Sequence, residues 1–327
     1  MTVIGFTCAK GSPGVTTTAL ALAWAWPRVH PGHRVLVIDA DPAGAGTTFG
    51  FLRGQVPGRC GVLDWAAGLR APARAGGHGP GLDARRWLWE HLVAFDQDAT
   101  RLLLPGAGDA AQAQAVAQGW DVLAQVVRGI TKAGEAEGSG DPVDVLIDLG
   151  RAGTVGERQD LWRACGVLVV VTRSSLAQAA AAAALVDHLH RQFPDGPAVR
   201  VVLVGQGAPY RASEIAMAVH VPVAGVLAMD RASAAVFSDG APTRRGLETS
   251  PLLRSAHTLA SALSTDERSR TPASARARAN PGEAHPGADT APSVPGASVK
   301  DAPGAGRSPW LASVEPPGRN GTGGSHA

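Results

Sequence analysis

The sequence predicts one large α/β domain with a doubly wound, mainly parallel sheet, followed by a long tail. Two observations carry this prediction. Over residues 1–264, short apolar runs alternate with helical segments, a pattern typical of buried parallel strands connected by helices. After residue 264 the composition turns to Pro, Gly, Ala, Ser and Arg, and such a segment buries too little apolar surface to fold.

In the first half of the domain, strands are expected at residues 2–7, 34–38 and 101–104. Helices are expected at residues 16–26, 87–95 and 110–132. Pro27 should end the first helix, because proline has no N–H to donate. The first strand, helix and second strand form a βαβ unit, for which a right-handed crossover is the rule. Residues 71–81, rich in Gly and Pro, are an expected loop.

In the second half, strands are expected at residues 143–147, 167–172, 199–204 and 225–228. Helices are expected at residues 176–193, 213–219 and 251–263. We therefore predict one domain over residues 1–264 and a disordered tail rich in Pro, Gly and Ala over residues 265–327. A short apolar island around Trp310 interrupts the tail. It is either an accidental apolar pair or a docking motif that orders on a partner.

Charge and composition exclude several classes of function. The formal net charge of +2 gives no strong attraction to nucleic acid or to a membrane surface. Three scattered cysteines are neither a disulfide framework nor a zinc site. No signal peptide is visible, and no apolar run is long enough for a transmembrane segment. These features predict a cytoplasmic protein.

The loop after the first strand, residues 9–18, carries the clearest functional signal. It lies between a buried strand and a helix, where backbone N–H groups and the helix N-terminus can bind phosphate. Gly11 and Gly14 permit a tight turn, Thr16 is placed to reach a magnesium ion, and Thr17 is placed to reach the phosphates. The predicted nucleotide contacts are Gly11, Ser12, Gly14, Val15, Thr16 and Thr17. The alternative is a Gly/Pro turn without a ligand.

This loop resembles the deviant Walker A motif of the ParA/MinD ATPases, K-G-G-x-G-K-[ST]. Gly11, Gly14, Thr16 and Thr17 match, and Lys10 falls on the signature lysine, which in relatives reaches the phosphates of the partner subunit. The resemblance implies a sheet of the P-loop NTPase type, ATP and Mg²⁺ as ligands, and an ATP-dependent homodimer.

The loop also departs from the family's motif. Val15 replaces the second lysine, Ser12 replaces a glycine, and Pro13 removes an N–H donor. A charge-assisted bond of the kind that Val15 cannot make contributes about 1.5–3 kcal/mol, so we predict weak ATP binding and slow or absent hydrolysis. The CpaE/TadZ pilus-localisation branch resembles this chain in replacing the same lysine by a small uncharged residue.

Two further segments place carboxylates beside the loop. Residues 35–44 resemble the family motif V-L-[LV]-[IV]-D-x-D-P-x-G, with Asp39 and Asp41 at the carboxyl end of a strand. By resemblance, these two aspartates position the attacking water and the hydrated magnesium. Residues 143–148 resemble a Walker B strand that ends in Asp148, a further magnesium carboxylate. Otherwise Asp39 and Asp41 are a polar turn that caps the strand.

The resemblance assigns roles to the remaining residues. It gives Lys10, Asp39 and Asp41 as catalytic residues, and Thr16, Asp41 and Asp148 as magnesium ligands. Asp230, Arg231 and residues 237–242 resemble the region near the nucleotide base and the dimer edge. Relatives follow the Walker B aspartate with T-P, whereas this chain has Leu-Gly-Arg over residues 149–151, so the switch behaviour of this segment is not carried over.

Three functions follow as hypotheses. The first is an ATP-gated dimer that positions cellular machinery, such as a Tad-type pilus or secretion system, with a secretion ATPase as a candidate partner that recruits it to the membrane or a cell pole. The second is a scaffold that acts through its surfaces and tail, which Pro13 and Val15 favour. The third is a DNA partition ATPase, which the low net charge does not favour because nonspecific DNA binding needs many phosphate contacts.

Overall fold

The structure is a computed structural model that describes residues 1–43, 46–70, 84–136, 142–154, 158–205, 209–243 and 245–268. The predicted loop at residues 71–81 lies outside the described residues. So does the predicted tail beyond residue 268, with the Trp310 island. Residues 265–268, which we assigned to the tail, belong to the last helix.

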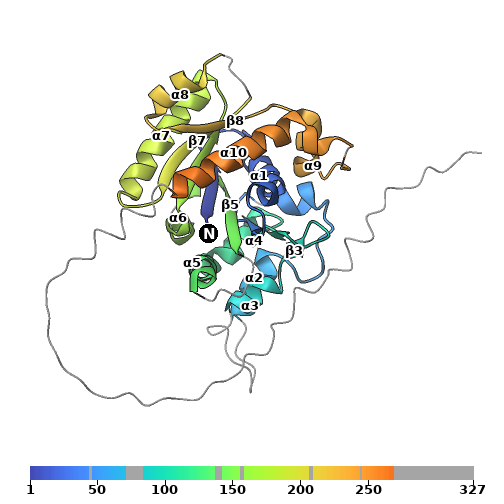
Figure 1. The fold of residues 1–327 in the computed structure, drawn as a ribbon. Coiled ribbons are helices and arrows are strands. Elements are labelled where there is room, and N and C mark those ends of the chain that lie inside the picture. The colour runs from blue at the N-terminus through green and yellow to red at the C-terminus, as the bar shows by residue number, and fades with distance from the viewer. Residues whose placement is uncertain are drawn as a thin grey trace, which may run out of the picture.

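Within the described residues, eight strands form one sheet in the order β3-β4-β2-β5-β1-β6-β7-β8 (Figure 1). All neighbouring strands are parallel except the pair β3 and β4. The strands are β1 (Val3–Cys8), β2 (Arg34–Asp39), β3 (Val93–Ala94), β4 (Arg101–Leu104), β5 (Val143–Arg151), β6 (Val167–Thr172), β7 (Ala198–Val204) and β8 (Val223–Leu227). The predicted mainly parallel sheet is confirmed.

Helices cover both faces of this sheet, as a doubly wound fold requires. They are α1 (Val15–Val29), α2 (Val62–Arg70), α3 (Ala84–Trp89), α4 (Ala110–Val116), α5 (Trp120–Ala136), α6 (Gln159–Ala164), α7 (Leu176–Gln192), α8 (Ala212–Val219), α9 (Arg231–Ser238) and α10 (Pro251–Arg268). Alternate strand residues point to opposite faces. Ile4 and Phe6 of β1 join the core formed with α1, α9 and α10, whereas Val145 and Ile147 of β5 join the core formed with α2 and α4–α8.

Three of the predicted helix boundaries were wrong. Helix α1 passes Pro27 and ends at Val29, since a proline so near the end removes a single helical bond and His30 N still donates to Trp26 O at 2.9 Å. The expected helix 110–132 is divided into α4 and α5 by a short 3-10 turn, Ala117–Gly119. A Cβ on Gly119 would lie 3.2 Å from the Trp65 ring, so the chain passes close to α2 there.

The third error concerns residues 87–95. Helix α3 ends at Trp89, and residues 93–94 form the edge strand β3. Val93 pairs with Leu103 of β4, so backbone pairing with an existing strand prevails over the helical pattern. Strand β5 also continues past Ile147 as far as Arg151. Helices α2, α6 and α9 were not predicted.

Asp144, near the start of β5, connects three neighbouring groups at the amino end of the strands through its carboxylate. Its Oδ1 accepts from Thr2 N at 2.8 Å, and its Oδ2 accepts from Trp26 Nε1 at 2.8 Å and contacts His33 Nδ1 at 2.7 Å. With His30, these side chains bring His and Asp ligand atoms within 4.8 Å of one another. Because the carboxylate already bonds to three groups of the protein, we interpret this cluster as structural.

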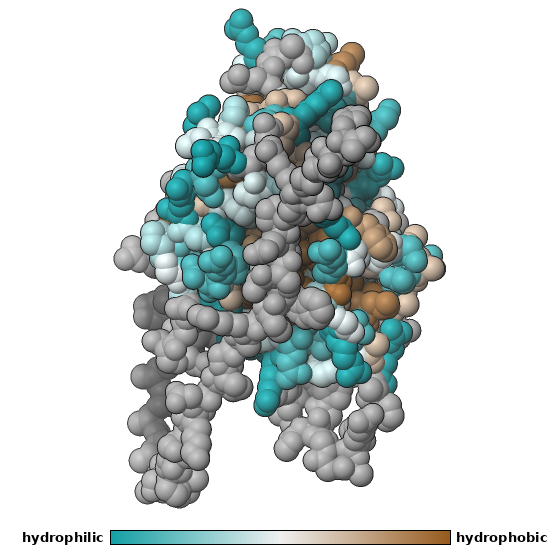
Figure 2. Space-filling model, turned by 90° about the vertical axis from the view of Figure 1, so that its right-hand side faces the viewer, coloured by the Kyte–Doolittle hydropathy of each residue, from teal (hydrophilic) through white to brown (hydrophobic). Residues whose placement is uncertain are grey.

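The exterior carries few large apolar side chains. Phe49, Leu176, Met217 and Met229 are exposed among the described residues. Figure 2 shows hydrophobic residues in small groups between hydrophilic ones on the face it displays, which is ordinary for a folded domain. None of the helices in the described part of the chain combines the length and the apolar character needed to cross a membrane.

Candidate nucleotide site

The loop between β1 and α1 has the backbone shape that the sequence predicts. Gly11 and Gly14 both have positive φ, 71° and 102°, and Gly14 is the N-cap of α1. A side chain at either position would be strained, and a Cβ on Gly11 would also lie 2.9 Å from Nε2 of Gln178 on α7. The glycines therefore allow the turn and the close approach of α7.

The first turn of α1 supplies N–H groups at the mouth of this loop. Thr18 N donates to Gly14 O at 2.8 Å and closes the first turn of the helix. The N–H groups that precede Thr18 have no partner within the helix. Together with the positive end of the helix dipole, they favour an anion at this position.

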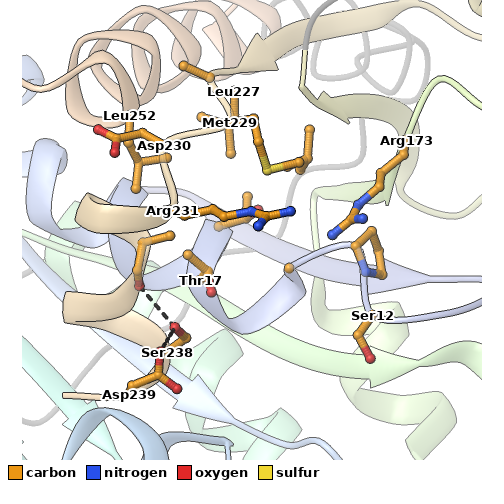
Figure 3. Close-up of a pocket in the computed structure, with 16 residues that line it drawn as sticks. Ser12, Thr17, Arg173, Leu227, Met229, Asp230, Arg231, Ser238, Asp239 and Leu252 are labelled. Atoms are coloured by element: carbon orange, nitrogen blue, oxygen red, sulfur yellow. Dashed lines mark hydrogen bonds between the residues drawn. The ribbon is translucent and has the colours of Figure 1, made fainter. Parts of the chain in front are cut away.

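Two cavities meet at the loop. The loop cavity, of about 680 Å³, lies between residues 11–17 on one side and Asp41, Gly46, Gly150 and Arg151 on the other. The α9 cavity, of about 410 Å³, lies beside it and shares residues 12–14, Thr17 and Ser238. In Figure 3, Arg173 and Arg231 extend toward each other across the α9 cavity, above Thr17. The site thus has one compartment beside the helix N-terminus and a second toward α9.

Asp148 joins the loop to the sheet. Thr16 Oγ1 donates to Asp148 Oδ2 at 2.5 Å, and Gly150 N donates to Asp148 Oδ1 at 2.9 Å. Asp148 is fully buried. Burial, followed by the charge of Asp39, raises the pKa of the Asp148 carboxyl to about 8. An added cation beside Thr16 would stabilise the ionised carboxylate.

Asp39 lies in register with Asp148 on the neighbouring strand, but its oxygens are engaged by the protein. Thr47 donates to Asp39 Oδ2 from its hydroxyl at 2.5 Å and from its N–H at 3.2 Å, and Asp41 N donates to Oδ1 at 3.1 Å. Burial raises the pKa of Asp39 as well. In this structure Asp39 holds the first turn of the short π-helix Gly46–Phe51 through Thr47, and its predicted part in positioning water stays a prediction.

Asp41 faces the loop cavity. Its Oδ1 accepts from Ala43 N at 2.9 Å. A Cβ on Gly150 would lie 2.1 Å from this same oxygen, so the end of β5 packs directly against the Asp41 carboxylate. Asp39, Asp41 and Asp148, here called the strand-end aspartates, therefore gather at the carboxyl edge of the sheet as predicted.

These residues fit a triphosphate with a magnesium ion. Helix N–H groups would face the phosphates, and a hydroxyl with two carboxylates, from Thr16, Asp41 and Asp148, is an oxygen donor set that Mg²⁺ prefers.

Val15 and Lys10 occupy different environments. The Val15 side chain is only 7% exposed and packs in the core with α1 and β1. Lys10 is exposed and is not among the residues that line the two cavities. No protein cation therefore comes from position 15, and Lys10 is accessible from solvent.

The sequence did not assign Arg151 or Arg173 to the site. Both line its cavities, and Arg151 Nη2 donates to Gly11 O at 3.1 Å. The contact joins residues 140 positions apart, which no local pattern reveals. The sequence feature that could have pointed to Arg151 is that residues 149–151 differ from the T-P that follows the Walker B aspartate in the family's motif.

Comparison with known proteins identifies the fold. No protein-family model matches the chain, and no curated protein sequence matches it. Solved structures do. MinD of Pyrococcus horikoshii OT3 with Mg-ADP has 18% identity and a TM-score of 0.59, covering 82% of this chain and 97% of that one. MinD of Aquifex aeolicus has 17% identity and a TM-score of 0.58, covering 81% and 98%.

A ParA family ATPase from Chlorobium tepidum TLS is similar to the same degree, with 15% identity, a TM-score of 0.58, and coverage of 79% of this chain and 97% of that one. Each neighbour is matched over almost its whole length. The chain therefore has the fold of the MinD and ParA ATPases, and the predicted P-loop NTPase type of sheet is confirmed.

Proposed function

We propose that the chain is an ATP-binding dimer switch of the ParA/MinD kind. The observation that carries this proposal is the loop cavity, where the N-terminus of α1, Thr16 and the Asp41 carboxylate face one space, while the buried Asp148 accepts a hydrogen bond from Thr16. Solved neighbours with the same fold include a MinD complexed with Mg-ADP and an McdA variant with ATP. Their ligands support, by analogy, ATP and Mg²⁺ as the ligands of this site.

Each compartment takes one part of the nucleotide. The phosphates lie at residues 11–17 against the helix N-terminus, with Thr16, Asp41 and Asp148 toward the magnesium ion. The base lies in the α9 cavity between β8 and α9. Magnesium would supply charge neutralisation of the phosphates, and the strand-end aspartates would hold its hydration shell.

Lys10 acts on a second copy of the chain. Its exposure at the start of the loop leaves its ammonium group available to phosphates that are bound by the partner subunit. ATP would then hold two copies together, and the dimer would recruit machinery to one place in the cell. A Tad-type pilus or secretion system is the proposed cargo, and a secretion ATPase is the proposed protein partner.

Hydrolysis is weak or absent in this proposal, because position 15 supplies no cation to the β- and γ-phosphates. The strand-end aspartates still support slow turnover, with Asp39 and Asp41 placing the water. The scaffold hypothesis is retained for the same reason: Val15 and Pro13 weaken the phosphate contacts on which a nucleotide switch depends.

Mass in solution tests the switch. The full chain is measured with and without ATP-Mg²⁺, beside Lys10→Ala and the matched control Lys132→Ala on α5. We expect ATP-dependent dimers of the wild type and of the control, and monomers of Lys10→Ala. If millimolar ATP-Mg²⁺ leaves the mass and the melting temperature of the wild type unchanged, the switch is excluded in favour of the scaffold.

A further inference from the structure

We infer that Arg151 supplies the phosphate-binding cation that Val15 cannot supply. The inference rests on the proposed nucleotide site and adds a residue to it. The chain departs from the family's motifs at Val15 in the loop and at Leu149-Gly150-Arg151 after the Walker B strand. On this inference the two departures are linked, because the arginine replaces the lysine that is absent from the loop. The cation moves from the helix to the neighbouring strand.

The position of the Arg151 guanidinium supports this role. Nη2 donates to the carbonyl of Gly11 at 3.1 Å, so the cation lies at the loop itself. Arg151 also lines the loop cavity together with Thr16, Thr17 and Asp41. The side chain is exposed, so an anion that enters the cavity can replace the Gly11 carbonyl as its partner.

The backbone of Arg151 is held by the sheet. Strand β5 extends beyond Asp148, and Arg151 pairs with Cys8 at the end of β1, immediately before the loop. Thr7 Oγ1 donates to Gly150 O at 2.9 Å, and Gly150 N donates to Asp148 at 2.9 Å. On the other side, the buried Arg158 donates to Leu149 O at 2.7 Å. These bonds fix the position of the Arg151 backbone, from which the guanidinium extends, relative to the loop.

The chemistry of the guanidinium suits the exchange. Arginine stays protonated at all relevant pH values and binds two phosphate oxygens at once, whereas a lysine is a point charge. From a strand beside the loop, Arg151 would approach the phosphates from the side of the strand-end aspartates. Arg173 and Arg231 are less suitable, because they line the α9 cavity, where the base is proposed to lie.

The test is the affinity of the full chain for ATP-Mg²⁺, measured by calorimetry for five proteins: the wild type, Arg151→Ala, Val15→Lys, the double variant, and the matched control Arg191→Ala at the exposed end of α7. Arg151→Lys is added to separate charge from bidentate geometry. Circular dichroism and melting temperature confirm that each variant is folded, and Arg151→Gln replaces Arg151→Ala if the latter is not.

We expect Arg151→Ala to weaken ATP binding about 10- to 100-fold, as for a lost charge-assisted bond. Arg151→Lys should lose less, and Arg191→Ala should bind like the wild type. The double variant should regain most of the affinity, because Val15→Lys restores a cation at the loop. The inference is overturned if Arg151→Ala binds ATP as the wild type does, or if Val15→Lys does not restore binding in the double variant. A wild type that binds no ATP contradicts the proposed function itself.

Discussion

The hydroxyl of Thr16 lies 2.5 Å from Oδ2 of Asp148, and this hydrogen bond joins the first turn of α1 to a strand 132 positions away. It couples Thr16, which lines the loop cavity, to a buried carboxylate that does not line the cavity itself. Because the Asp148 carboxyl is buried and its pKa is raised to about 8, the pair has more to gain from a divalent cation than two exposed groups would.

Thr16→Ala should therefore reduce the magnesium dependence of ATP binding. In the wild type, chelation of Mg²⁺ should weaken ATP binding, because the phosphates then lose the charge neutralisation that Mg²⁺ would supply. Without the Thr16 hydroxyl, the gain from Mg²⁺ should fall about tenfold, which corresponds to about 1.4 kcal/mol. Calorimetry with Mg²⁺ and with EDTA measures the ATP affinity of each protein under the two conditions. Thr258→Ala, on the exposed face of α10, is the matched control, and equal magnesium dependence in all three proteins would contradict the assignment.

Gly150→Ala should destabilise the end of β5. Gly150 has a φ of 59°, and a Cβ there would lie 2.1 Å from Asp41 Oδ1. Strain and displacement of the carboxylate should lower the free energy of unfolding by about 1–3 kcal/mol, as urea denaturation would show. The control is Gly129→Ala on α5, where an added Cβ meets nothing within 4 Å. It should be neutral or stabilising, since alanine favours a helix. Equal stability of the two variants would show that Gly150 is not required.

Ala234→Leu should interfere with the base but not with the phosphates. Ala234 lines the α9 cavity and does not line the loop cavity, so the larger side chain fills only the proposed base compartment. ATP affinity should fall about tenfold or more, by analogy with the cost of extra carbons in a shaped pocket. Tripolyphosphate affinity should stay unchanged. Ala232→Leu, exposed on the same helix, is the control. Unchanged ATP affinity would place the base elsewhere, and loss of both affinities would show that the substitution also disturbs the phosphate compartment.

Asp144→Ala should destabilise the protein without changing nucleotide affinity. It leaves the buried Thr2 N–H and Trp26 Nε1–H without their acceptor, at a cost of about 2–4 kcal/mol of unfolding free energy. Asp144 lies at the opposite end of β5 from Asp148, so ATP binding should be retained at temperatures where the variant is folded. Asp195→Ala, on an exposed turn, should change the stability by less than about 0.5 kcal/mol. A folded Asp144→Ala that has lost ATP affinity would show that the two ends of β5 are coupled.

The fold and the loop could be predicted from the sequence because their signals are local. A buried apolar strand, Gly11, Gly14 and the start of a helix are consecutive in the chain, and their geometry needs no distant partner. The same holds for the position of Asp41 at the end of β2. Strand β3 could not be predicted in this way, because Val93 becomes a strand residue only through its pairing with Leu103.

The environment of the site residues depends on tertiary contacts and was therefore missed. Nothing in the spacing of Asp39 indicates that Thr47 engages its carboxylate. Nothing near Arg151 indicates that β5 continues beyond Asp148 and brings the guanidinium to Gly11. The departure from the family motif at Val15 was visible in the sequence, but the candidate replacement was visible only once β1 and β5 were side by side.

A structure of the full chain crystallised with excess ATP and Mg²⁺ tests the nucleotide site most directly. The account predicts phosphate density against the N–H groups of residues 11–17, a metal ion near Thr16 and Asp148, and the Arg151 guanidinium on a phosphate oxygen. Density for an intact loop without phosphate, with the cavity filled by the protein's own side chains, would contradict it.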